Sequence, residues 1–81
     1  MKYNVYSIQD TLVGYNAPFI MVSDEVAKRE FTNSLTKNPN KEYLKLWKIA
    51  EFDEDEGTIT SIPNELVMKG VDLNGSTENT I

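Results

Sequence analysis

The chain has 81 residues and a formal net charge of −5, with 40% hydrophobic and 26% charged residues. These fractions are typical of globular proteins, so the sequence predicts one small folded domain. The chain has no cysteine and no histidine, which excludes disulfides, thiolate metal sites and catalytic triads that use imidazole. We therefore expect a non-enzymatic protein without metal or cofactor. No apolar run approaches the ~20 residues of a membrane span, so no membrane contact is expected.

Two strands are predicted before the first helix. Residues 2–9 are rich in β-branched and aromatic side chains, which is typical of a strand. Residues 10–16 contain a glycine and several polar residues, so they are expected to form a loop. Residues 19–22 are apolar and predict a second, short strand that begins after Pro18.

A single helix is expected from Asp24 to Thr36. Ser23 is a favourable N-cap, and two acidic residues follow it in the first turn, where the helix dipole favours negative charge. Ala27, Phe31 and Leu35 recur every fourth residue and form one apolar stripe. The segment Asn38-Pro39-Asn40 ends the helix, because proline disfavours the helical conformation of the residue before it.

The second half of the chain predicts a β-hairpin. Residues 43–52 form the strongest strand pattern, and the acidic residues 53–56 with Gly57 predict a tight turn. Residues 58–62 form the returning strand, and Pro63-Asn64 is expected to end it. Residues 65–69 are compatible with either a helical turn or a further short strand. In the long strand, alternation predicts one face with Leu44, Leu46, Ala50 and Phe52, and an opposite face with Tyr43, Lys45, Trp47 and Ile49.

The order β-β-α-β-β predicts an α+β fold: a mostly antiparallel sheet of about four strands with one helix packed on one face. Residues 1–73 would form the single domain, and residues 74–81 a flexible C-terminal tail. The long strand is apolar on both faces, and one helix covers only one face of so small a sheet. We therefore expect a homodimer or larger homo-oligomer.

The basic segment is the candidate nucleic-acid-binding site, because single-strand binders combine cations with aromatic side chains on which bases stack. Its residues are Lys37, Lys41, Tyr43, Lys45, Trp47 and Lys48. The alternative is that the aromatic residues belong to the core and the lysines lie at its rim. The acidic net charge favours this alternative, because phosphate contacts dominate affinity for nucleic acid. The acidic turn lacks the ligand spacing of a calcium loop, so it is expected to be a solvated turn.

Several segments together resemble a known family. They are the opening strand Tyr3 to Asp10, the segment Ala17-Pro18-Phe19, the helical Ala27 to Phe31, the loop Asn38-Pro39-Asn40, the strand Leu46 to Asp53, the turn into Gly57-Thr58-Ile59, and a late Gly70. In their order, over roughly residues 3–73, the chain resembles the small nonstructural protein of gokushovirus-type microviruses, which are phages with circular single-stranded DNA genomes.

The resemblance implies a viral nonstructural protein in the host cytoplasm. Such a protein would assist single-stranded DNA synthesis and genome packaging, with viral replication or procapsid proteins as partners. Two alternatives remain open: a protein that binds single-stranded DNA directly, and a phage inhibitor of a host protein. The resemblance assigns no site residues.

Overall fold

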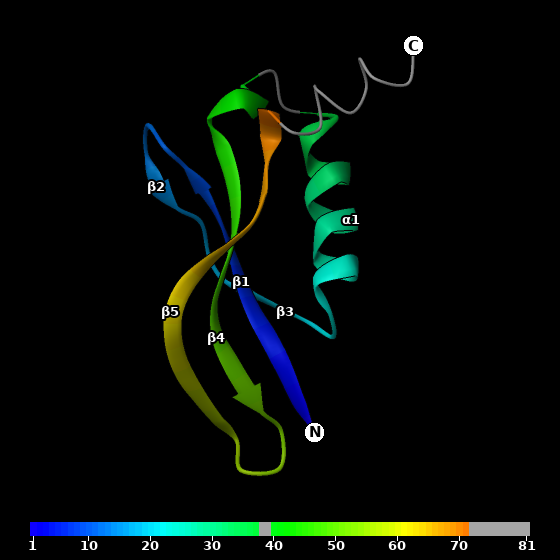
Figure 1. Ribbon diagram of the computed structural model, residues 1–81, viewed down its shortest axis with the longest axis vertical. Helices are drawn as coiled ribbons and strands as arrows, with labels where there is room; N and C mark the ends of the chain where they lie inside the picture. The colour runs from blue at the N-terminus through cyan, green and yellow to red at the C-terminus, as the bar shows by residue number, and fades with distance from the viewer. Residues whose placement is uncertain (38–39, 72–81) are drawn as a thin grey trace.

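The computed structural model describes residues 1–37 and 40–71. Its elements are β1 (Lys2–Asp10), β2 (Gly14–Tyr15), β3 (Phe19–Met21), α1 (Asp24–Leu35), the short 3₁₀ helix η1 (Lys41–Tyr43), β4 (Leu44–Asp53) and β5 (Thr58–Lys69). All paired strands are antiparallel, in the order β2-β1-β4-β5, and β3 also pairs with β1 (Figure 1). The predicted small antiparallel sheet with one helix is therefore confirmed, although three strands and not two precede the helix.

Two predicted strand boundaries are wrong. The loop expected over residues 10–16 contains β2, which pairs with the end of β1 and begins at Gly14 with a φ of 140°. In the second half of the chain, β5 continues through Pro63 to Lys69, so Pro63 does not end the strand as predicted. Pro63 is tolerated because β5 is an edge strand, and residues 62–64 lie opposite Ile49 alone, where the regular ladder is interrupted.

The helix agrees closely with its sequence signals. The Ser23 hydroxyl accepts a hydrogen bond from the Val26 amide at 3.3 Å, and Thr36 caps the other end. The predicted stop at Asn38-Pro39 lies outside the described residues, as does the predicted tail over residues 74–81. Residues 72–73, the end of the predicted domain, lie outside them too.

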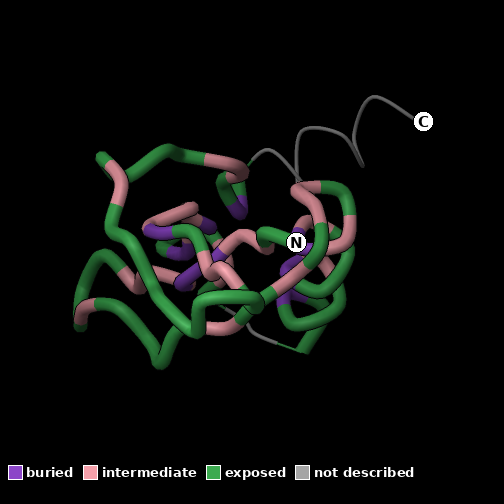
Figure 2. Tube along the Cα trace, turned by 90° about the horizontal axis from the view of Figure 1, so that it is seen from below, coloured by how far each residue is buried: buried purple, intermediate pink, exposed green. Residues whose placement is uncertain are grey.

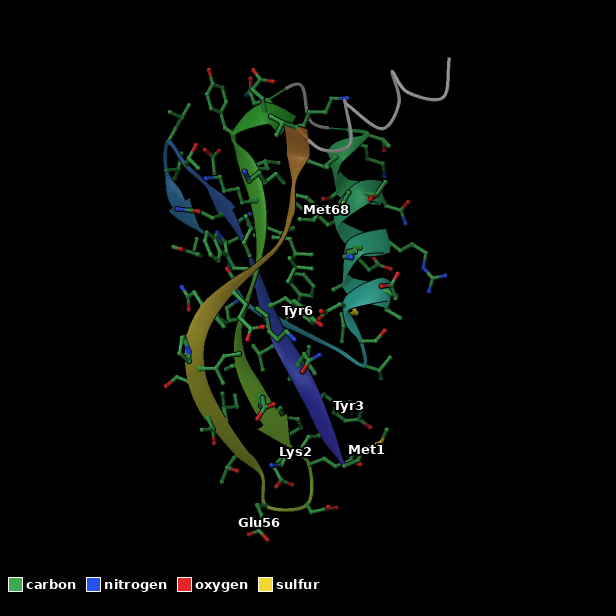
Figure 3. All side chains as sticks on the ribbon, in the orientation of Figure 1. Met1, Lys2, Tyr3, Tyr6, Glu56 and Met68 are labelled. Carbon is green, nitrogen blue, oxygen red and sulfur yellow. The ribbon has the colours of Figure 1, made fainter. Side chains whose placement is uncertain are left out.

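The core lies where α1 meets the sheet. It consists of Tyr6 from β1, Leu44 and Leu46 from β4, and the helical stripe Ala27, Phe31 and Leu35. Figure 3 shows Tyr6 and Met68 between the strands and the helix. Figure 2 shows that the buried residues gather inside the molecule, whereas most residues on the outside are exposed.

The helix is much shorter than the sheet that it packs on. Twelve helical residues span about 18 Å, whereas the 12 residues of β5 span about 40 Å. The hairpin of β4 and β5 therefore extends well beyond the helix, and the molecule is elongated, with extents of 46 × 27 × 21 Å (Figure 1). A large part of the sheet is left without a helix over it.

Candidate binding surface

A one-residue β-bulge decides which side chains face away from the helix. Val5 pairs with Ala50, but the next residue of β1, Tyr6, pairs with Lys48, so Ile49 is an extra residue in β4. The sequence alternation placed Ala50 and Phe52 with Leu44 and Leu46, and this is wrong. Because paired residues share a face, the bulge moves Ala50 and Phe52 to the side opposite the helix.

We call this side the helix-free face, and the register arranges it in four rows across the strands. From the β1–β2 turn toward the β4–β5 turn, the rows are Tyr15, Gln9, Lys45 and Lys69; then Ser7, Trp47 and Leu66; then Ile20, Val5, Ala50 and Ser61; and finally Tyr3, Phe52 and Ile59. The face is thus polar in its first row and mainly apolar in the other three.

Some side chains of the helix-free face are buried within the chain itself, whereas others are exposed to solvent. Val5 and Ala50 are buried, and the Ser7 hydroxyl donates a hydrogen bond to the Asn16 carbonyl at 2.8 Å. By contrast, four large apolar side chains keep between 42% and 63% of their surface exposed, and these are Tyr15, Ile20, Ile59 and Leu66. Such a cluster on one face is typical of an interaction surface.

Only part of the basic segment lies on this face. Lys45 and Trp47 are there, and the Trp47 indole donates a hydrogen bond to the Gln9 amide oxygen at 2.8 Å. Trp47 is partly buried and is not in the helix-side core. Lys41 and Tyr43 belong to η1, at the end of the sheet, and Lys37 follows the helix. The structure therefore does not bring the six predicted residues together in one site.

Lys48 lies on the helix side in a polar cluster. Its ammonium group is 3.4 Å from a carboxylate oxygen of Asp24 and 3.6 Å from one of Glu65. The Tyr6 hydroxyl donates a hydrogen bond of 2.5 Å to the same Asp24 carboxylate and accepts one from Asn4 at 3.0 Å. The cluster connects the start of α1 to β1, β4 and β5 by hydrogen bonds and ion pairs, so Lys48 has a structural role here.

The polar cluster also shifts two pKa values. The hydrogen bond from Tyr6 lowers the pKa of Asp24, and the nearby Lys48 ammonium adds to this effect. Burial, followed by the hydrogen bond to Asp24, raises the pKa of Tyr6 well above its usual value. Both shifts favour the same state, in which a neutral tyrosine donates to an ionised carboxylate.

The β1–β2 turn displays apolar side chains that the sequence interpretation missed. The Asp10 side chain accepts a hydrogen bond from the Leu12 amide at 2.9 Å, and the Asp10 carbonyl accepts one from Val13 at 3.0 Å. The Thr11 amide donates to the Tyr43 carbonyl at 2.9 Å, which fixes the turn to η1. Leu12 and Val13 are nevertheless 70% and 87% exposed. Two adjacent apolar residues in a polar loop were the available sequence signal.

The acidic turn at the opposite end is ordered by its own hydrogen bonds. The Asp53 carboxylate accepts hydrogen bonds from the amides of Asp55 and Glu56 at 3.0 and 3.3 Å, and Gly57 has the positive φ of 68° that the turn prediction required. Tyr3 donates to Glu54 at 3.2 Å, and this hydrogen bond raises the pKa of Tyr3. Figure 3 shows Tyr3 and Glu56 at this end of the molecule.

Within the described ranges, 1–37 and 40–71, no three metal-ligating side chains come together and no pocket is enclosed. None of the helices in that part of the chain combines the length and hydropathy that a membrane span requires.

The chain was compared with curated proteins, solved structures and family models. No match was found among curated proteins or among solved structures. The family model described as "Phage ORF5 protein" matches residues 3–73, which contain every element of the fold except the first residue of β1. The chain therefore belongs to the Phage ORF5 protein family.

Proposed function

We propose that this chain is a nonstructural protein of a microvirus-type phage that acts by binding other viral proteins during single-stranded DNA synthesis and genome packaging. Membership of a phage family supports the viral setting. The absence of histidine and cysteine from the sequence favours binding over catalysis. In this proposal the partners are replication or procapsid proteins of the same phage, and the protein works in the cytoplasm of the host.

The observation that carries this proposal is the exposed apolar turn Leu12-Val13. Short turns are usually polar, and side chains this exposed contribute little to the core. The turn is nevertheless held in one shape by hydrogen bonds to Asp10 and Tyr43. A preorganised apolar tip loses little conformational entropy when it enters a pocket of a partner. It therefore suits a protein that docks onto an apolar site of a viral partner.

Complementation of a phage with a stop codon in this gene tests the proposal. The wild-type gene supplied in trans should restore single-stranded progeny DNA and filled particles, and the variant L12S/V13S should not. V22S is the matched control, because Val22 is also exposed. Purified L12S/V13S should keep the wild-type unfolding midpoint but lose co-purification with the replication initiator or procapsid proteins. Full complementation by L12S/V13S would refute the proposed role of the turn.

Direct binding of single-stranded DNA is the second candidate function. It is favoured by the first row of the helix-free face, where Lys45 lies between Gln9 and Lys69, with Tyr15 at the sheet edge and Trp47 in the next row. Cations beside aromatic rings are typical of sheets that bind single strands. An oligonucleotide titration at two salt concentrations tests it: binding should weaken with salt and be lost in K45E. K48E is not informative here, because Lys48 lies on the helix side.

A further inference from the structure

The helix-free face has an apolar middle and oppositely charged ends. We propose that it binds a second copy of this chain, in a two-fold symmetric dimer in which the strands of one copy run antiparallel to those of the other. This proposal is independent of the Leu12-Val13 turn and of the phage partner, because it concerns the broad face of the sheet and not its tip.

The apolar middle supplies the reason for association. Ile20, Ile59 and Leu66 belong to three different rows of the face and are about half exposed. Tyr3 and Phe52 stack beside them, with ring centroids 6.5 Å apart. A second sheet placed about 10 Å away would cover these side chains, as in a β-sandwich. The two helices would then lie on the outer sides of the dimer.

The charges at the two ends of the face select both the partner and its orientation. The lysine row contains Lys45 opposite Lys69, and the acidic turn beyond the last row contains Glu54, Asp55 and Glu56. The N-terminal ammonium pairs with Asp55 at 2.8 Å, and the turn remains negatively charged. Lys45 and Asp53 are eight residues apart in β4, which corresponds to about 26 Å. This separation exceeds the Debye length of about 8–10 Å at moderate salt, so each end interacts mainly with whatever lies directly against it.

Only one of the two face-to-face arrangements satisfies both ends. If the two-fold axis runs across the strands, the lysine row of each copy lies against the acidic turn of the other, and two favourable contacts form. If the axis runs along the strands, the two acidic turns lie at the same end and repel each other. A surface that is complementary to itself after a two-fold rotation is the property that a symmetric dimer requires. A nucleic acid would satisfy the lysine row but would be repelled by the acidic turn.

Sedimentation velocity over a range of concentrations tests the proposal with two charge-reversed variants. K45E/K69E makes both ends acidic, whereas D55K/E56K removes the net negative charge of the acidic turn and leaves the lysine row unchanged. For each variant alone, the dissociation constant of the dimer should be at least about tenfold higher than that of wild type at low salt, with a smaller difference in 1 M NaCl. An equimolar mixture should form the mixed dimer in preference to either homodimer, because the acidic turn of K45E/K69E then meets the intact lysine row of D55K/E56K. R29E/K37E is the matched control, since it makes the same change in net charge away from the face.

Three results would overturn the proposal. One is a wild-type chain that sediments as a monomer at 100-micromolar-range concentrations. Another is a dimer whose stability is unchanged in K45E/K69E, as expected for the arrangement with the strands parallel. The third is a monomer that binds an oligonucleotide through Lys45, which would assign the face to nucleic acid. L66E should also prevent dimerisation, whereas L12S/V13S should dimerise normally, so failure of the dimer and failure of the viral-partner role are distinguishable.

Discussion

Gly70 provides the most direct test of the packing, and the perturbation is the addition of one methyl group. A Cβ atom at this position would overlap the Lys41 carbonyl oxygen and lie 3.3 Å from the Leu44 carbonyl oxygen. Both neighbours are backbone atoms and cannot move aside by a rotamer change. Gly70→Ala must therefore displace either the end of β5 or η1.

The expected cost follows from the kind of overlap. Forcing an extra methyl group into a packed site costs about 1–3 kcal/mol, and the backbone neighbours favour the upper part of this range, so we expect about 2–3 kcal/mol. An 81-residue domain has a total stability of roughly 4–12 kcal/mol. The loss is therefore a large fraction of the total. With an m-value of about 1 kcal/mol/M in urea, the unfolding midpoint should fall by about 2–3 M.

Urea unfolding followed by Trp47 fluorescence measures this shift. Gly57→Ala is the matched control, because Gly57 also has a special conformation, with a φ of 68°, but no atom lies within 4 Å of an added Cβ. That variant should lose only about 1 kcal/mol from backbone strain. If Gly70→Ala is as stable as Gly57→Ala, this result would contradict the close approach between Gly70 and η1. It would also contradict the position of Tyr43, in η1, beside the β1–β2 turn.

Three further predictions concern the core and the polar cluster. Phe31→Ala should cost about 3–5 kcal/mol in urea unfolding, because the ring is fully buried; a loss below 1 kcal/mol would contradict the helix packing. The lowered pKa of Asp24 contributes stability above the usual carboxyl pKa of about 4, and this is lost as pH falls further; the difference between midpoints at pH 7 and pH 3 should be smaller in D24N. The raised pKa of Tyr6 contributes stability that is present below pH ~10 and lost as pH rises above it. Y6F should therefore lose less stability between pH 8 and pH 11 than wild type does, and an equal loss would show that Tyr6 ionises freely.

Local signals predicted the elements that depend on neighbouring residues. The Ser23 cap, the stripe of Ala27, Phe31 and Leu35, and the turn at Gly57 all involve contacts within a few positions of the chain, and all are confirmed. The strand β5 was divided wrongly at Pro63, because local rules treat proline as a strand end. Its tolerance depends on an edge position that is defined only by the complete sheet.

The candidate site was predicted less well, because its composition depends on a bulge. Alternation from Leu44 assigns Phe52 to the helix side, but the extra residue Ile49 reverses the assignment. A bulge has no clear signature in a single strand, since it is defined by the register with a partner. Alternation alone places Lys48 on the face opposite Lys45, and this is confirmed, but its pairing with Asp24 across the helix–sheet contact has no local signal in the sequence.

The bulge at Ile49 explains why the protein has two differently organised faces. Without it, Ala50 and Phe52 would continue the helix side, where α1 is too short to cover them, and the opposite face would lose the aromatic stack with Tyr3. With it, the apolar residues of the β4–β5 hairpin join Trp47 and Leu66 in one continuous face. The sheet thereby gathers the exposed apolar side chains of its strands on one side, between a basic and an acidic end. The proposed dimer would cover this surface, and the charge-reversed variants test whether it forms.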